Sequence, residues 1–156
     1  MAVTNPPDPA AELTNGTKPA IDGKWDWPAL QAGAGVCLLL AIPLTLLAAF
    51  VDSDNSGANA LFFFGAMGGF VLGAGCAAWV QRTGTPISHG LVTAMSAYAA
   101  AQAVFITIRL IGGNDVNWFG VFFTLSLVVG AGLIGGLLAS FLQSRGFLPS
   151  TQRPTQ

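Results

Sequence analysis

The chain has 156 residues, of which 53% are hydrophobic and only 8% are charged, whereas about a quarter of the residues in a soluble domain carry a charge, so the composition is typical of an integral membrane protein. Six Lys and Arg against seven Asp and Glu give a formal net charge of -1, so there is no basic surface for nucleic acid, and we expect no nucleic-acid partner. Two Cys and one His exclude a disulfide framework and a His-based metal cluster.

The amino-terminal segment, residues 1–27, is polar and rich in Pro. It contains too little apolar surface to fold alone. It also lacks the basic start, apolar core and cleavage site of a signal peptide. We therefore predict a disordered cytoplasmic tail over residues 1–27.

Four apolar segments follow, each long enough to cross a bilayer as a helix. None of them contains Asp or Glu. We predict transmembrane helices at about 29–51, 58–81, 90–111 and 118–143. These helices make up one domain over residues 28–143, and a short polar cytoplasmic tail covers 144–156. The expected fold class is all-α, an integral membrane four-helix bundle.

Small residues recur at every fourth position in these segments, a spacing that puts them on one helix face. In lipid, such faces let two backbones approach closely, which supplies much of the drive for helix association. The helix-packing residues that this pattern predicts are Gly33 and Cys37 in the first helix, Gly65, Gly69, Gly73 and Ala77 in the second, and Gly132 and Gly136 in the fourth. We expect the first and second helices to pack through these faces.

The basic residues lie mainly on one side of the predicted bundle. Only Arg109 falls on the other side, whereas the side of both termini carries Lys18, Lys24, Arg82, Arg145 and Arg153. By the positive-inside rule, both termini are expected in the cytoplasm.

The third segment carries the polar groups of most interest, because an ionisable residue inside a membrane span usually points to function. Tyr98, Gln102 and Arg109 fall on one face of the predicted helix. Two interpretations stay open: the face lines a polar crevice, or Gln102 bonds across the bundle while Arg109 anchors the helix at the interface. His89, at the start of this helix, is interpreted as an interfacial or capping residue, with proton sensing as the alternative.

Catalytic constellations are absent from the sequence. It contains no Ser-His-Asp set, no paired carboxylates within a span, no phosphate loop and no metal cluster. Its glycine pairs lie inside apolar segments rather than after a strand, so they are packing features and not nucleotide fingerprints. We expect a protein that is not an enzyme and that binds no cofactor.

Several features follow one another along the chain: the Pro- and Ala-rich amino tail, the loop from Asp52 to Gly57, the glycines Gly65, Gly69 and Gly73, and the entry to the third helix from Thr85 to Gly90. This layout resembles that of the many small, uncharacterised four-helix inner-membrane proteins of bacteria. The resemblance implies a multi-pass protein of the bacterial cytoplasmic membrane, and it carries over no activity.

Two functions fit these expectations. The first is a non-enzymatic accessory or scaffold subunit in the lipid bilayer, which packs as a homo-oligomer or against the subunits of a larger membrane complex. It is favoured because the helices carry more small-residue faces than a four-helix monomer needs, and because the spans lack charged groups for transport. The alternative is a small transporter or channel whose polar crevice is lined by the third helix.

Overall fold

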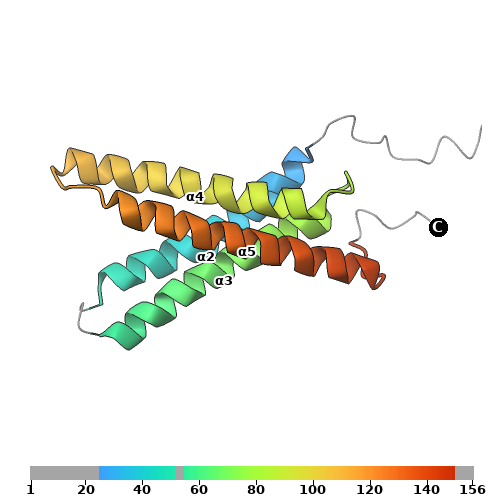
Figure 1. Cartoon of the computed structure of the whole chain (residues 1–156), viewed down its shortest axis with the longest axis horizontal. Coiled ribbons are helices and arrows are strands. Elements are labelled where there is room, and N and C mark those ends of the chain that lie inside the picture. Colours follow the sequence, from blue (N-terminus) through green and yellow to red (C-terminus); the bar gives the residue numbers. More distant parts are fainter. Residues whose placement is uncertain (1–24, 52–54, 150–156) are drawn as a thin grey trace, which may run out of the picture.

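The structure is a computed structural model that describes residues 25–51 and 55–149. Within these ranges the chain is all-helical, with α2 (Trp27–Ala49), α3 (Ser56–Val80), α4 (Pro86–Ile111) and α5 (Trp118–Ser144) (Figure 1). Each helix is long and apolar enough to cross a membrane. The predicted all-α fold with four potential membrane spans is therefore confirmed, whereas most of the predicted tail over 1–27 and the end of the tail over 144–156 lie outside the described residues.

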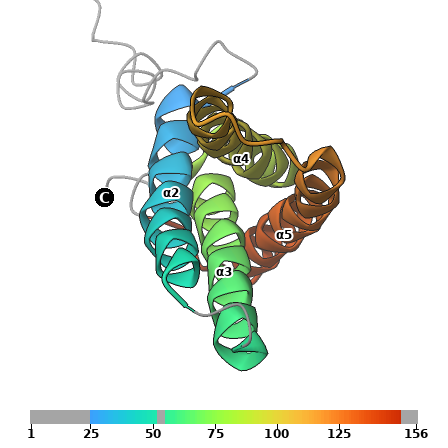
Figure 2. The ribbon, with the colours of Figure 1, turned by 90° about the vertical axis from the view of Figure 1, so that its left-hand side faces the viewer.

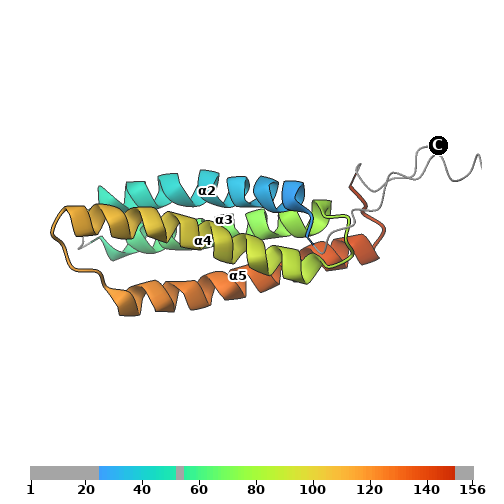
Figure 3. The same cartoon turned by 90° about the horizontal axis from the view of Figure 1, so that it is seen from above.

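The helices form two antiparallel hairpins, α2–α3 and α4–α5. Helices α3 and α4 each contact all three other helices, whereas α2 and α5 lie on opposite sides and do not touch. Viewed along the bundle, α2 and α5 are accordingly separated by the other two helices (Figure 2). The hairpins lie closest together at the end where α2 begins and α5 ends, and they diverge toward the opposite end (Figures 1 and 3). We call the first the terminal end and the second the hairpin end.

Three of the helices have an N-cap residue whose side chain bonds to the first turn. Asp26, Asn55 and Asn117 each accept a hydrogen bond from a backbone N–H in the first turn of α2, α3 and α5, which satisfies a donor that the helix itself leaves unpaired. Helix α4 begins at Pro86, earlier than the expected start at residue 90. Pro suits this position because the first helical residues need no N–H of their own.

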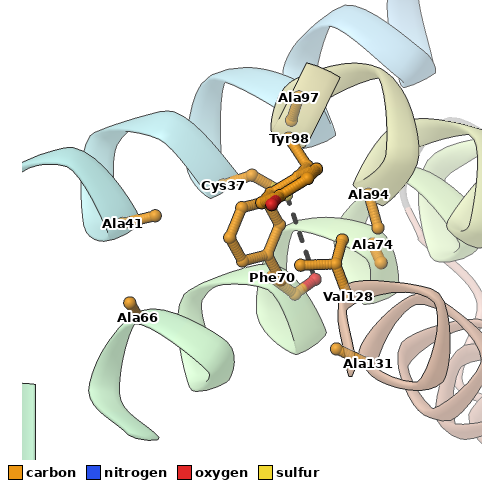
Figure 4. Packing of buried hydrophobic residues seen from close by; sticks show 10 residues of the cluster. All are labelled: Cys37, Ala41, Ala66, Phe70, Ala74, Ala94, Ala97, Tyr98, Val128 and Ala131. Carbon is orange, nitrogen blue, oxygen red and sulfur yellow. Dashed lines mark hydrogen bonds between the residues drawn. The ribbon is translucent and has the colours of Figure 1, made fainter. Parts of the chain in front are cut away.

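The buried core is thin and is built mainly from Ala and Gly, with a few larger side chains such as Phe70, Tyr98 and Val128 (Figure 4). The large apolar side chains point outward instead: Phe119 is 81% exposed and Leu39 is 74% exposed. A water-soluble monomer rarely exposes so much contiguous apolar surface. The apolar outer surface is therefore the kind expected of a protein whose helices are surrounded by lipid.

Helices α2 and α3 cross with their backbones in contact. A Cβ added to Gly73 would collide with the sulfur of Cys37 and lie 2.6 Å from the carbonyl oxygen of Gly33. A Cβ on Gly33 would lie 2.5 Å from the Cβ of Ala77. Farther along the same interface, a Cβ on Gly69 would lie 2.8 Å from the Cβ of Leu40. Any side chain at Gly33 or Gly73 would thus push the two helices apart.

The remaining member of the predicted α3 face, Gly65, is less crowded. A Cβ there would lie 3.1 Å from the end of the Leu44 side chain, which is a flexible contact rather than a backbone one. Together with the α2–α3 crossing described above, this contact shows that the interface loosens from Gly73 toward the hairpin end.

Helix α5 uses two faces of small residues. Gly132 and Gly136 pack against the start of α4, where a Cβ on Gly90 would lie 2.9 Å from the Gly132 carbonyl oxygen. Gly135 faces α3 instead, and a Cβ there would lie 2.5 Å from the Val71 carbonyl oxygen and 2.8 Å from the Gly75 nitrogen. The sequence pattern singled out Gly132 and Gly136 but not Gly75, Gly90 or Gly135.

Candidate functional site

A crevice of about 660 Å³ lies toward the hairpin end and is lined by residues of all four helices. Most of its wall is apolar, with aromatic rings from α3 and α4 that include Phe62, Phe63, Phe70 and Phe105. Its lining residues come from the parts of the four helices nearer the hairpin end, and the two hairpins diverge toward that end (Figure 1). The crevice is therefore a consequence of tight packing at one end of the bundle and loose packing at the other.

The structure brings the three predicted polar residues of the third span together in this crevice. Tyr98, Gln102 and Arg109 all line it, along the α4 wall. Tyr98 is buried, Gln102 is half-buried and Arg109 is exposed. The polar groups therefore follow the crevice from its deepest part to its mouth.

Tyr98 forms part of the crevice floor. Its hydroxyl donates a 2.7 Å hydrogen bond to the carbonyl oxygen of Val121 on α5, and its ring lies edge-on to that of Phe70, with the centroids 6.3 Å apart. Figure 4 shows the two rings between Cys37 and Val128, both of which are fully buried. The thiol of Cys37 is oriented toward the Phe70 carbonyl oxygen at 3.9 Å. Beyond this layer lie the glycine crossings, so the crevice has a closed inner end.

Arg109 lies at the mouth. Its Nη1 donates a 3.2 Å hydrogen bond to the carbonyl oxygen of Asp115 in the turn between α4 and α5. Within the described ranges it has no carboxylate partner, and Asp52 and Asp54 lie outside those ranges. Asn117, which caps α5, also lines the crevice. A guanidinium and a helix amino terminus, both electropositive, thus meet at the opening.

The terminal end holds a second polar cluster, centred on His89. This side chain is fully buried, whereas an interfacial or capping residue was expected. Its Nε2 accepts a 3.0 Å hydrogen bond from the backbone N–H of Asp26, and its Nδ1 lies 3.0 Å from the carbonyl oxygen of Thr85. This pattern fits a neutral imidazole with its proton on Nδ1, because Nε2 must act as the acceptor. The ring of Trp25 covers the imidazole at 5.4 Å between centroids.

Asp26 and Gln81 organise the loop that joins the hairpins. Both are polar, yet they are only 4% and 1% exposed. One Asp26 oxygen accepts from the N–H of Ala29 and the other from that of Arg82, and the Gln81 oxygen accepts from the N–H of Thr83 at 2.7 Å. These buried oxygens satisfy backbone donors, so their role is structural.

Helix α5 is tied to α3 at the same end. The indole N–H of Trp79 donates to the carbonyl oxygen of Phe147 at 2.8 Å. The amide of Gln143 donates to the carbonyl oxygens of Ala78 and Trp79. With the bond between Asp26 and His89, these contacts join the two hairpins at the terminal end.

Neither cluster resembles a metal site. In the part of the chain that the structure describes, no group of three or more His, Cys, Asp or Glu side chains could hold a metal ion. Comparison with known proteins does not assign a family: no family model, no curated protein and no solved structure matches the chain.

Proposed function

We propose that this chain is a multi-pass protein of the bacterial cytoplasmic membrane that binds an apolar or amphipathic molecule in the crevice, as a small transporter does. The distribution of Lys and Arg supports a cytoplasmic position for both termini. The hairpin end, with the crevice mouth, then faces the opposite side of the membrane.

The observation that carries this proposal is that Tyr98, Gln102 and Arg109 all line one largely apolar crevice. Ligand sites are typically concave, largely apolar and supplied with a few polar groups, with volumes of about 300–1,000 Å³. The crevice, at about 660 Å³, has these properties. Placing polar groups within a membrane span costs free energy, so such groups usually mark a functional site. All three of these residues lie along the crevice wall.

The closed inner end favours a binding site over a pore. The buried layer of Tyr98, Phe70 and Val128 separates the crevice from the terminal end, where backbone contacts leave no room for a side chain at Gly33 or Gly73. A continuous channel does not fit this arrangement. A site that opens toward one side of the membrane does, and a transporter requires such a state.

The polar groups of the crevice favour binding over catalysis. They comprise hydroxyls, carboxamides and the guanidinium of Arg109. Hydroxyls and carboxamides donate and accept hydrogen bonds and the guanidinium donates them, but none of these groups readily exchanges protons near neutral pH. We propose that the protein is not an enzyme.

Filling the crevice tests the proposal. Ala101 lines it, so Ala101→Trp is expected to reduce the amount of any specifically bound molecule by about tenfold or more, because the indole occupies the same space. The wild type and the variant are purified in mild detergent from the native membrane, and co-purifying small molecules are extracted and identified by mass spectrometry.

The matched control is Ala32→Trp, since Ala32 is exposed and lies outside the crevice. This variant is expected to retain the bound molecule at the wild-type level. A set of co-purifying molecules that is the same in wild type and Ala101→Trp contradicts the proposal.

A second candidate function, the accessory or scaffold subunit, is supported by one exposed face of α4. Its small side chains lie within a narrow arc at helical spacing: Ser96, Ala100, Ala103 and Thr107. In lipid such a face favours association with another helix. It is exposed in the single chain, so a second copy or another subunit is free to cover it.

The particle mass in nanodiscs tests this second candidate. We expect a homo-oligomer or a defined complex for the wild type, and a shift toward the single chain for Ala103→Leu, because the added side chain prevents close backbone approach. Val104→Leu, a change at an exposed large residue, serves as the control. A wild-type protein that is monomeric and co-purifies with nothing excludes this function.

A further inference from the structure

We propose that the molecule held in the crevice is an anionic lipid from the surrounding bilayer, with its head group at Arg109 and an acyl chain along the aromatic wall toward Tyr98. This inference rests on the proposed function and names the chemical class of its ligand. Three observations carry it: the charge at the mouth, the depth of the wall and the apolar exterior.

The positive charge of Arg109 at the mouth favours an anionic head group. Arg109 donates one hydrogen bond to a neutral carbonyl oxygen, and its charge has no carboxylate partner in the ranges that the structure describes. A guanidinium has five N–H donors, so most remain for a phosphate or carboxylate. The capped amino terminus of α5 at Asn117 adds a favourable potential for a negative charge.

The depth of the crevice suits an extended hydrocarbon chain. Along α4, the distance from Arg109 at the mouth to Tyr98 at the floor is about 16 Å at 1.5 Å per residue. Between them the crevice is lined by Phe105 and Ile106 from the same helix and by Phe62 and Met67 from α3. These side chains offer van der Waals contacts along that length rather than hydrogen bonds, as a flexible apolar chain requires.

The position of the crevice makes the bilayer the source of the ligand. The helices that line it are long and apolar enough to cross a membrane, and their outer surfaces carry exposed large apolar residues such as Leu39 and Ile108. Acyl chains of the bilayer therefore surround the helices that line the crevice. A water-soluble phosphate ester has no acyl chain to contact the apolar wall, so a ligand from the aqueous phase fits the crevice less well.

The test measures lipid retention by native mass spectrometry. The purified full chain is exchanged into detergent with added phosphatidylglycerol or phosphatidylcholine of identical acyl chains. We expect the wild type to retain phosphatidylglycerol in preference to phosphatidylcholine, and Arg109→Gln to lose roughly fivefold of that preference, the factor expected for one cation at a membrane surface. An excess of glycerol phosphate is expected to leave the lipid bound.

Arg145→Gln is the matched control, because Arg145 is also exposed but lies at the terminal end, over the ring of Phe141. It is expected to keep the preference for phosphatidylglycerol. An equal loss in Arg109→Gln and Arg145→Gln overturns the inference, since it indicates general attraction of anionic lipid. Displacement of the lipid by glycerol phosphate also overturns it, because the head group alone then carries the binding.

Ala101→Trp separates failure of this inference from failure of the proposed function. Retention that is abolished by Ala101→Trp but is equal for both lipids overturns the anionic assignment and leaves the crevice as a binding site. If the wild type retains neither lipid, and no other co-purifying molecule is lost in Ala101→Trp, both the anionic-lipid inference and the proposed binding function are overturned. Preference for phosphatidylglycerol that is lost in Arg109→Gln and in Ala101→Trp supports both.

Discussion

Replacing Gly73 with Ala is expected to lower the free energy of unfolding by about 1–3 kcal/mol, the usual effect of adding a methyl group to a fully packed interface. The added Cβ would collide with the Cys37 sulfur and lie within 2.7 Å of the Cys37 backbone nitrogen. Backbone atoms of α2 cannot give way locally, so the whole α2–α3 crossing has to open. Reversible unfolding in mixed micelles, followed as the SDS fraction rises, measures the change.

Gly68→Ala is the control for this prediction. It lies in the same helix and receives the same added methyl group, but a Cβ at Gly68 meets no atom within 4 Å. We expect its stability to equal or slightly exceed that of the wild type, because Ala has the higher helix propensity. Equal destabilisation by the two substitutions would show that helix contact at Gly73 is not the cause.

Replacing His89 with Ala is expected to destabilise the protein by about 2–4 kcal/mol, since it leaves a buried donor without an acceptor and also creates a cavity. The Asp26 N–H loses its 3.0 Å hydrogen bond to Nε2, and Trp25 loses the ring against which it packs. The same unfolding titration measures the loss. Hydrogen exchange shows where the stability is lost: the Asp26 amide is expected to exchange faster in His89→Ala than in the wild type.

The neighbouring substitution Ser88→Ala provides the comparison, because Ser88 is exposed in the same turn of α4. Its effect is expected to stay within about 0.5 kcal/mol, as for most surface changes. If His89→Ala is as mild as Ser88→Ala, the hydrogen bond between the two hairpins does not contribute to stability.

Much of the fold follows from the sequence because membrane spans are specified by long, strong patterns. Four long apolar segments without Asp or Glu predict four helices, and the structure has α2, α3, α4 and α5 with ends close to the predicted ones. The largest difference is the start of α4 at Pro86. The preceding Thr85, a residue type suited to helix caps, and the Pro itself were the available signals.

Part of the candidate site also follows from helical periodicity. Tyr98, Gln102 and Arg109 share a face at 100° per residue, and in the structure that face lines the crevice. Periodicity within one helix cannot say which neighbours surround that face, because this depends on how the hairpins diverge. The α3 wall, including Phe62 and Met67, was therefore not predicted.

The terminal cluster could not be predicted for a similar reason. His89 and Asp26 are distant in the sequence, and each alone looks like an ordinary residue at a helix end. Their contact depends on the crossing of α2 over α4, which the small residue Gly33 permits by packing against Thr93. Tertiary geometry, rather than local pattern, thus converts two end residues into a buried pair.

The unequal packing along the bundle has a consequence for how this protein can diversify. At the terminal end, helices meet through backbone atoms at Gly33, Gly73 and Gly132, so a larger residue at any of these three positions is expected to weaken the fold. At the hairpin end, side chains of varied size line an open crevice, and their replacement leaves those backbone contacts unchanged. Related chains can therefore acquire new ligand preferences through substitutions at the hairpin end while the terminal end preserves the fold.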